Sequence, residues 1–546
     1  MKFKFFSFWQ KKRIQIKANQ KFSAIELKLR YAKPLKAMLI FSLPTIFIML
    51  TIALYGLVDK FFVQLFAADN LINNDYIHYL WNNVMHEKNP LTIQILKTFL
   101  NVALQYDLVF FYLGISVISL LGIGASINYS IAYGKKDYEK MRQIFANTII
   151  LNFLFSFLVF FFLFFFTYPG FGSLFIRFQQ GFGKATFNPI VSYITWKFLL
   201  IFYLFLPFAF INFLLNNIIK AQGNRFSLVF VMILSVFVNI GFDVIFIIYC
   251  HLITDGAMLA TGCAYIFNII LAIILILRNP DHRLRLNWES FRFKPVLFGF
   301  ILRSGATSGI TKFANAIFSM INSIFIVNLL VNKSVFIHNN LSMLQEITAS
   351  LTPWLVFVTN VCIGINQGSR ILISYAHGAQ KYKRIKSITK YSFLFQALWI
   401  TFSVSMLMIF SSFFLHIFNF ETNVHFNYHL YVIFYIWSFP FASLTFSAII
   451  LFSSIQKSKF SIIIALIRSV FAIIILQIIG FIISNQALSI NSKFSGLPYF
   501  ISVGSRDLFT MIPALAIFLK FYQKNKSNIV DHQKEEDILY YAKLKE

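Results

Sequence analysis

The sequence predicts an all-α polytopic membrane protein with twelve transmembrane helices, arranged as two six-helix bundles related by pseudo-twofold symmetry. Three observations support this prediction. The 546 residues are 58% hydrophobic and only 12% charged, whereas a soluble domain is about 25% charged. Twelve segments are long and apolar enough to cross a bilayer, which needs about 20 residues each. The second half of the chain also repeats motifs of the first half in the same order.

The twelve apolar segments are expected to be helices, because a backbone inside lipid must satisfy its own hydrogen bonds. The alternating segments of about ten residues that a membrane β-barrel needs do not occur in this sequence. The predicted spans are residues 37–63, 106–132, 144–168, 190–215, 227–249, 256–277, 297–329, 349–375, 388–417, 429–453, 460–484 and 498–521.

The positions of Lys and Arg predict the orientation in the membrane. With both termini in the cytoplasm, the inside segments hold 35 of the 48 Lys and Arg residues and the outside loops hold 6. Cytoplasmic loops are enriched in these residues, so we expect a multi-pass protein of the cell membrane with both termini cytoplasmic. The net charge of +28 is then a basic surface against the anionic inner leaflet of the bilayer, and no nucleic-acid partner is expected.

The spans and their connections predict five regions. Residues 1–36 form a basic cytoplasmic segment, 37–277 an N-lobe with spans one to six, and 278–296 a polar cytoplasmic linker. Residues 297–522 form a C-lobe with spans seven to twelve, and 523–546 form a cytoplasmic tail.

An internal repeat supports the division into two lobes. Residues 124–138, after span two, match residues 368–382, after span eight, at one constant offset. The turn QGNRFS at 222–227, after span four, has a counterpart QKSKFS at 456–461, after span ten. The halves therefore have the same orientation, and parallel repeats suit a transporter that rocks around a central cavity.

Two glycines of this repeat, Gly134 and Gly378, stand just before basic residues at the ends of spans two and eight. Glycine tolerates the left-handed conformation that commonly ends a helix. We therefore expect both residues to be helix stops, with no role in substrate binding.

Several of these motifs resemble a known family. The stretch from Pro44 to Asp59 with its segment YGLVD, the paired loops and the turn at Gln222 are similar to the multidrug and toxic compound extrusion (MATE) family, with its DinF-like and NorM-like members, in the MOP flippase superfamily. The resemblance covers about residues 37–522. It implies a twelve-helix antiporter, coupled to Na⁺ or H⁺, that exports amphipathic, often cationic organic compounds. No cofactor besides the coupling ion is expected, and we expect a monomer.

Charged residues within the spans are functional candidates, because a buried charge is costly in a bilayer. Asp59 lies late in span one, Asp243 lies in span five one turn after Asn239, and Thr261 lies early in span six. At 1.5 Å per residue, all four fall in the outer half of the membrane. Asp107 stands at the edge of span two.

These four residues, Asp59, Asn239, Asp243 and Thr261, suit two uses. Their oxygens could bind Na⁺, or the two carboxylates could share a proton because like charges repel strongly in a low dielectric. The resemblance implies an ion site at the same four residues. Archaeal and DinF-like members of the family use an Asp of helix one, an Asn and an Asp of helix five and a Thr of helix six, and the four residues of this sequence match those positions. A purely structural pairing of Asp59 with Lys60 or another cation is the alternative, although adjacent helical residues point about 100° apart.

The C-lobe differs from the NorM-like pattern of acids in helices seven and ten, since spans seven and ten contain none. A NorM-type sodium site in this lobe is therefore not expected. Lys312, Arg506 and Asp507 lie at similar depths, which predicts a structural Lys312–Asp507 ion pair. Alternatively, Lys312 or Arg506 selects an anionic or zwitterionic substrate. Arg468 in span eleven either has one of these two roles or extends its side chain toward the cytoplasm.

Two other functions are alternatives to an antiporter. A flippase or exporter of a lipid-linked or anionic substrate, in the same superfamily, is supported by the basic residues inside the C-lobe. An enzyme is not expected, because the sequence has no zinc-protease motif, nucleophile elbow or phosphate-binding glycine loop. The last absence also argues against direct use of ATP.

Overall fold

The structure of the protein is a computed structural model. It describes residues 29, 31–86, 90–169, 176–177, 188–278, 291–331, 335–416, 428–487 and 497–524. Most of the predicted N-terminal segment, residues 279–290 of the predicted linker and most of the predicted tail lie outside the described residues.

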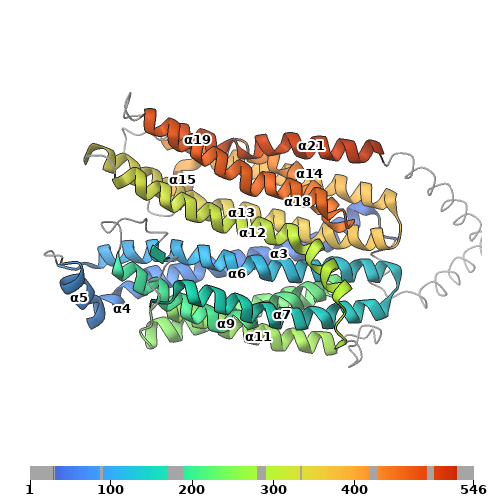
Figure 1. The fold of residues 1–546 in the computed structure, drawn as a ribbon, viewed down its shortest axis with the longest axis horizontal. Coiled ribbons are helices and arrows are strands. Elements are labelled where there is room, and N and C mark those ends of the chain that lie inside the picture. The colour runs from blue at the N-terminus through green and yellow to red at the C-terminus, as the bar shows by residue number, and fades with distance from the viewer. Residues whose placement is uncertain are drawn as a thin grey trace, which may run out of the picture.

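The described part of the chain is almost entirely helical and contains no strand. Figure 1 shows two bundles of long helices, the N-lobe below in blue to green and the C-lobe above in yellow to red. The N-lobe helices are α3 (Pro34–Phe62), η1 (Val63–Ala67), α4 (Ala68–Ile72), α5 (Asp75–Tyr79), η2 (Leu80–Val84), α6 (Ile93–Lys135), α7 (Tyr138–Thr167), α9 (Pro189–Gln222), α10 (Arg225–Asp243), η5 (Val244–Tyr249) and α11 (Thr254–Leu277).

The C-lobe helices are more often interrupted than those of the N-lobe. They are α12 (Pro295–Val331), α13 (Val335–Gly378), α14 (Tyr382–Ile409), α15 (Ser411–His416), α16 (Tyr428–Ile436), η8 (Phe439–Phe441), α17 (Ala442–Ser454), α18 (Ser458–Leu466), η9 (Ile467–Phe471), α19 (Ala472–Ala487), α20 (Leu497–Gly504) and α21 (Arg506–Lys524).

The predicted membrane helices are present. Within the described residues, eleven helical segments are long and apolar enough to cross a membrane, and they correspond to predicted spans one to six and eight to twelve. The seventh predicted span, 297–329, lies within α12, which is helical over 37 residues. Large apolar side chains on α7, such as Phe153, Phe157 and Phe161, are exposed, as expected for a helix that faces lipid tails.

The segment between spans one and two, expected as a polar outside loop, is mostly helical in its described part. Asn74 begins α5 by accepting hydrogen bonds from the backbone N–H groups of Tyr76 and Ile77, at 3.0 and 3.3 Å. Leu71 and Trp81 are buried in an apolar cluster with the N-terminal parts of α6 and α9. Because this segment is rich in asparagine, its composition did not indicate the buried residues that pack it against the N-lobe.

The two lobes meet through α3 and α6 on one side and α12 and α13 on the other. The contact is close at glycines: a Cβ atom at Gly124 would lie 2.1 Å from the carbonyl oxygen of Ile301, and one at Gly305 would lie 1.7 Å from that of Leu120. In Figure 1, α6 and α12 lie together toward the right and diverge toward the left.

The repeated glycines belong to this interface. They lie at helix ends as predicted, since α6 ends at Lys135 and α13 ends at Gly378, but the expectation that they adopt the left-handed conformation was wrong. The left-handed residues are Lys136 and Gln380, with φ of 61° and 58°, two residues after each glycine. A Cβ atom at Gly134 would lie 2.3 Å from the carbonyl oxygen of Tyr375, and one at Gly378 would lie 2.2 Å from that of Ile131. Close approach of the two lobes, not local backbone conformation, requires glycine here.

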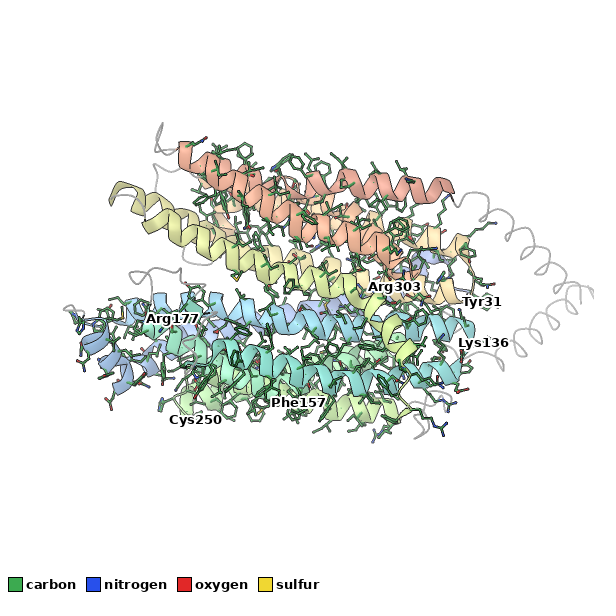
Figure 2. All side chains as sticks on the ribbon, viewed as in Figure 1. Tyr31, Lys136, Phe157, Arg177, Cys250 and Arg303 are labelled. Carbon is green, nitrogen blue, oxygen red and sulfur yellow. The ribbon has the colours of Figure 1, made fainter. Side chains whose placement is uncertain are left out.

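Polar side chains add to the same interface. Thr45 donates a hydrogen bond to the carbonyl oxygen of Gly364 at 2.7 Å, and Lys220 donates one to the side chain of Gln367 at 2.8 Å. The Gln456 amide donates to Asn128 Oδ1 at 2.9 Å. Lys220 stands at the C-terminal end of α9, and Asn128 stands two turns before the end of α6 at Lys135. Figure 2 shows Tyr31 and Lys136 at one end of the molecule, opposite the end with Arg177 and Cys250.

Candidate functional site

Three N-lobe helices bring the four predicted ion-site residues together. Asp59 lies near the end of α3, Asn239 and Asp243 lie on α10, and Thr261 lies on α11. The Thr261 hydroxyl donates a 3.0 Å hydrogen bond to Oδ2 of Asp59. The side chains of Asp243 and Asn239 lie near the same carboxyl group but form no hydrogen bond with it.

The group is buried and its hydrogen-bonding capacity is mostly unused. Asn239 and Asp243 are completely buried, and Thr261 is nearly so. Within the described residues, both oxygens of Asp243, both polar atoms of the Asn239 amide and Oδ1 of Asp59 have no close hydrogen-bond partner. Buried polar atoms normally have partners, so these atoms are candidates to bind a small ligand.

The local structure explains why these side chains converge. Asn239 and Asp243 are four residues apart and share one face of α10. A π-helical turn, η5, begins directly after Asp243, and such turns are frequent at functional sites. One turn before Asn239, the Ser235 hydroxyl accepts a 3.0 Å hydrogen bond from the Asn268 amide of α11, which fixes α10 against α11.

The arrangement can bind a small cation in two ways. Two carboxylates, an amide carbonyl and a hydroxyl are hard oxygen donors of the kind that alkali and alkaline-earth cations prefer. Alternatively, one proton on the Asp59–Asp243 pair would reduce the repulsion between two buried carboxylates. Both uses would neutralise negative charge that α3 and α10 bring together inside the lobe.

Asp107 is also buried, which its position at a span edge did not suggest. It lies on α6, is 2% exposed, and neither carboxylate oxygen has a hydrogen-bond partner within the described residues. Because α6 begins at Ile93 and extends well beyond the predicted span, Asp107 is not at a helix end. The apolar sequence before residue 106 is too short to have revealed this extension.

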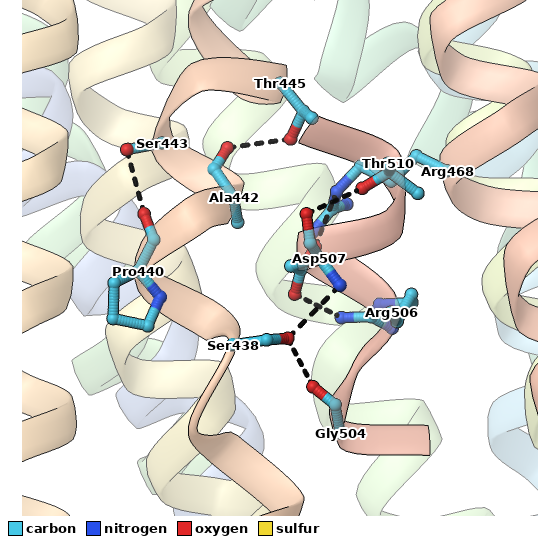
Figure 3. Close-up of polar contacts among 10 residues, drawn as sticks. All are labelled: Ser438, Pro440, Ala442, Ser443, Thr445, Arg468, Gly504, Arg506, Asp507 and Thr510. Carbon is cyan, nitrogen blue, oxygen red and sulfur yellow. Dashed lines mark hydrogen bonds and ion pairs between the residues drawn. The ribbon is translucent and has the colours of Figure 1, made fainter. Parts of the chain in front are cut away.

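In the C-lobe, Asp507 pairs with two arginines and not with Lys312, so the predicted Lys312–Asp507 pair was wrong. Arg468 Nη2 lies 2.8 Å from Asp507 Oδ1, and Arg506 Nη2 lies 3.2 Å from Oδ2 (Figure 3). Lys312 Nζ instead lies 6.0 Å from the ring centroid of Tyr112 on α6. Lys312 and Asp507 lie at a similar depth along the membrane normal, but their side chains are on helix faces that point in different directions.

A family comparison identifies the chain. The MatE family model matches residues 103–245 and 342–478, which together make up just over half of the sequence. The chain belongs to the MatE family. The two matched segments fall in the two lobes, in agreement with the internal repeat. Members of the MatE family are transporters, so this chain is a membrane transporter of the multidrug efflux type and not an enzyme.

Solved structures of MatE transporters share the fold. A MATE transporter in its bent conformation is 15% identical and aligns with a TM-score of 0.67 over 94% of this chain and 99% of its own. An outward-facing multidrug resistance MATE family transporter of the MOP superfamily is also 15% identical, with a TM-score of 0.67 over 93% and 99% of the two chains. No curated protein matches the sequence.

A third structure has the same fold in a transporter described differently. It is a MOP superfamily transporter from Pyrococcus furiosus, for which a binding pocket of reverse polarity is taken to suggest a different function. It is 14% identical to this chain and has a TM-score of 0.67 over 93% of this chain and 98% of its own.

Proposed function

We propose that this MatE transporter is a cation-coupled antiporter that exports amphipathic organic compounds, with Na⁺ or H⁺ bound at Asp59 and Asp243. The observation that carries the proposal is the buried group in which Thr261 donates to Asp59 while Asp243 and Asn239 face the same carboxyl. Its unpartnered oxygens come from α3, α10 and α11, so a bound cation would draw three helices of one lobe together.

The proposed mechanism is alternating access between the two lobes. The interface that contains Gly134, Gly378 and the Lys220–Gln367 bond is cytoplasmic in the orientation proposed from Lys and Arg, with both termini inside the cell. Contact at this end and divergence at the other (Figure 1) then correspond to an outward-open state. Cation binding in this state would favour substrate release, to the extent that the cation binds the two states with different affinity.

Two substrate classes have support. The resemblance to MATE members supports amphipathic cations, whose flat rings would stack on aromatic side chains. The second candidate, a flippase or exporter of an anionic or lipid-linked substrate, is favoured by the arginines paired to Asp507 inside the C-lobe. The protein is proposed to act as a monomer in the cell membrane.

Dye efflux from proteoliposomes tests the antiporter. We expect the purified protein to move a cationic rhodamine dye under an imposed Na⁺ or pH gradient, and Asp59→Asn or Asp243→Asn to abolish this movement without loss of folded protein. Asp69→Asn, on the exposed surface of α4, is the matched control and should transport normally. Undiminished efflux in both Asp59→Asn and Asp243→Asn would rule out this site.

A further inference from the structure

The C-lobe contains a second buried polar centre, where three interrupted helices meet. Span ten is interrupted between α16 and α17, span eleven contains the π-helix η9, and span twelve is interrupted between α20 and α21. Ser438 joins two of these points, because its hydroxyl donates to the Gly504 carbonyl and accepts a 3.2 Å hydrogen bond from the Asp507 backbone N–H. Transporters often build substrate sites from such discontinuous helices.

The charges at this centre do not cancel. Arg468 donates two hydrogen bonds, from Nε and Nη2, to Oδ1 of Asp507 at 3.0 and 2.8 Å. Arg506 reaches the other oxygen, Oδ2, at 3.2 Å. One carboxylate therefore serves two guanidinium groups, which leaves a formal charge of +1 inside the lobe. Such a charge is costly in a membrane protein and usually functional.

A donor at this centre remains unused. Nε of Arg506 is buried without a hydrogen-bond partner within the described residues. A guanidinium group can only donate hydrogen bonds, so a ligand bound to it would have to supply an acceptor. The Arg506 side chain is 25% exposed, compared with 11% for Arg468 and 3% for Asp507. Arg506 is therefore the accessible member of the cluster.

The repeat relates this centre to the cation site of the other lobe. The turn before span five matches the turn before span eleven, so Asp243 and Arg468 lie on equivalent helices. Spans six and twelve, which carry Thr261 and Asp507, are equivalent in the same way. Spans five and eleven thus carry opposite charges, Asp243 in the N-lobe and Arg468 in the C-lobe, and the two lobes favour ligands of opposite charge.

We propose that the C-lobe centre is a subsite for an anionic group, a carboxylate or a phosphate, of the transported molecule. Arg506 contacts this group, because a guanidinium binds such oxygens with its fork of N–H donors. Arg468 and Asp507 are positioning residues. The Asp507 carboxylate holds both guanidinium groups in place, and the ring of Phe446 packs against Arg468, with its centroid 4.3 Å from Cζ. This inference rests on the proposed transport function and specifies the chemistry of its substrate.

Equilibrium binding to the purified full-length protein, without any gradient, tests the subsite. Carboxyfluorescein and a rhodamine ester have similar ring systems and opposite charges, so fluorescence anisotropy compares anion and cation binding on one scale. We expect Arg506→Gln to weaken carboxyfluorescein binding about tenfold or more, the loss expected for a charge-assisted hydrogen bond. Rhodamine binding should not change, and Arg506→Lys should retain part of the anion affinity.

Matched variants separate the subsite from effects on folding. Arg303→Gln removes an exposed arginine of α12 and should bind both dyes normally. Asp507→Asn removes the carboxylate that positions Arg506 and should weaken carboxyfluorescein binding less than Arg506→Gln does, if the protein still gives a single peak in size-exclusion chromatography. Equal carboxyfluorescein affinity in the wild type and Arg506→Gln, loss of both dyes together, or no anion binding by the wild type would overturn the proposal.

The source of the anionic group is distinguished by competition. Displacement of carboxyfluorescein by short-chain phosphatidic acid, at concentrations where inorganic phosphate has no effect, indicates a lipid headgroup. Displacement by both at similar concentrations indicates a free organic anion. Asp243→Asn should retain carboxyfluorescein binding and lose gradient-driven efflux, so failure of the coupling mechanism and failure of the anion subsite give different results.

Discussion

Thr261 on α11 donates a 3.0 Å hydrogen bond to Asp59 on α3, although 202 residues separate them. The bond connects the first and sixth spans at the point where α10 adds Asn239 and Asp243. Two carboxylates in one buried group repel each other unless a cation or a proton lies between them. The tertiary packing of these helices thus brings two carboxyl groups together, as the proposed cation coupling requires.

Replacement of Thr261 by Val is predicted to distinguish Na⁺ from H⁺ as the coupling ion. If Na⁺ is bound, the variant loses a ligand and a hydrogen bond to a charged group worth about 1.5–3 kcal/mol, and apparent Na⁺ affinity should fall about tenfold or more. If the ion is H⁺, pH-driven transport should change little. Dye efflux at a series of Na⁺ concentrations measures the effect. Thr311→Val, which removes a hydroxyl bonded within α12, is the control.

A methyl group at Gly305 is predicted to open the contact between α12 and α6 that joins the lobes. The added Cβ would lie 1.7 Å from the Leu120 carbonyl oxygen, a backbone atom that cannot move without the helix. Overpacking of this kind costs about 1–3 kcal/mol, which shifts a two-state equilibrium about 5- to 150-fold. Gly299→Ala, at a position on α12 with no atom within 4 Å of the added Cβ, should have no effect.

Cysteine labelling measures this change. Ser42 of α3 is buried against Gly368 of the other lobe, so Ser42→Cys in a background without the three native cysteines should react slowly with a membrane-permeant maleimide. Gly305→Ala should accelerate the reaction several-fold. Equal labelling rates with Gly305→Ala and Gly299→Ala would mean that the glycine contact does not hold the lobes together.

Removal of Arg468 is predicted to destabilise the C-lobe. Breaking a buried ion pair by removing one partner costs about 3–5 kcal/mol, and Arg468→Gln leaves Asp507 with Arg506 alone. The double variant Arg468→Gln, Asp507→Asn should lose less stability than the sum of the two single losses, because both substitutions break the same ion pair. Thermal unfolding in detergent is the measurement. An additive loss in the double variant would show that Arg468 and Asp507 do not stabilise each other.

The sequence was sufficient to predict the helices and the convergence of the four candidate site residues, because each rests on one-dimensional information. Runs of apolar residues determine the spans, and a four-residue spacing places Asn239 and Asp243 on one helix face. Depth along the membrane normal then places Asp59 and Thr261 at the same level. Those estimates need only the rise per residue of a helix.

The remaining features depend on which way each helix faces. Lys312 and Asp507 share a depth, but the rotation of their helices directs Asp507 to Arg468 and Lys312 toward Tyr112. In the same way, Gly134 was interpreted from its neighbours in the chain, whereas the constraint comes from Tyr375 in the other lobe. Contacts between distant segments of this kind leave no local sequence signal.

Direct binding of the coupling ion to the purified transporter tests the central claim. We predict that the wild type binds radioactive Na⁺ or, if H⁺ is the coupling ion, releases a proton when a transported dye is added. The Asp59→Asn, Asp243→Asn double variant should do neither while remaining folded and monodisperse. Sodium binding or proton release equal to that of the wild type in the double variant would contradict the account.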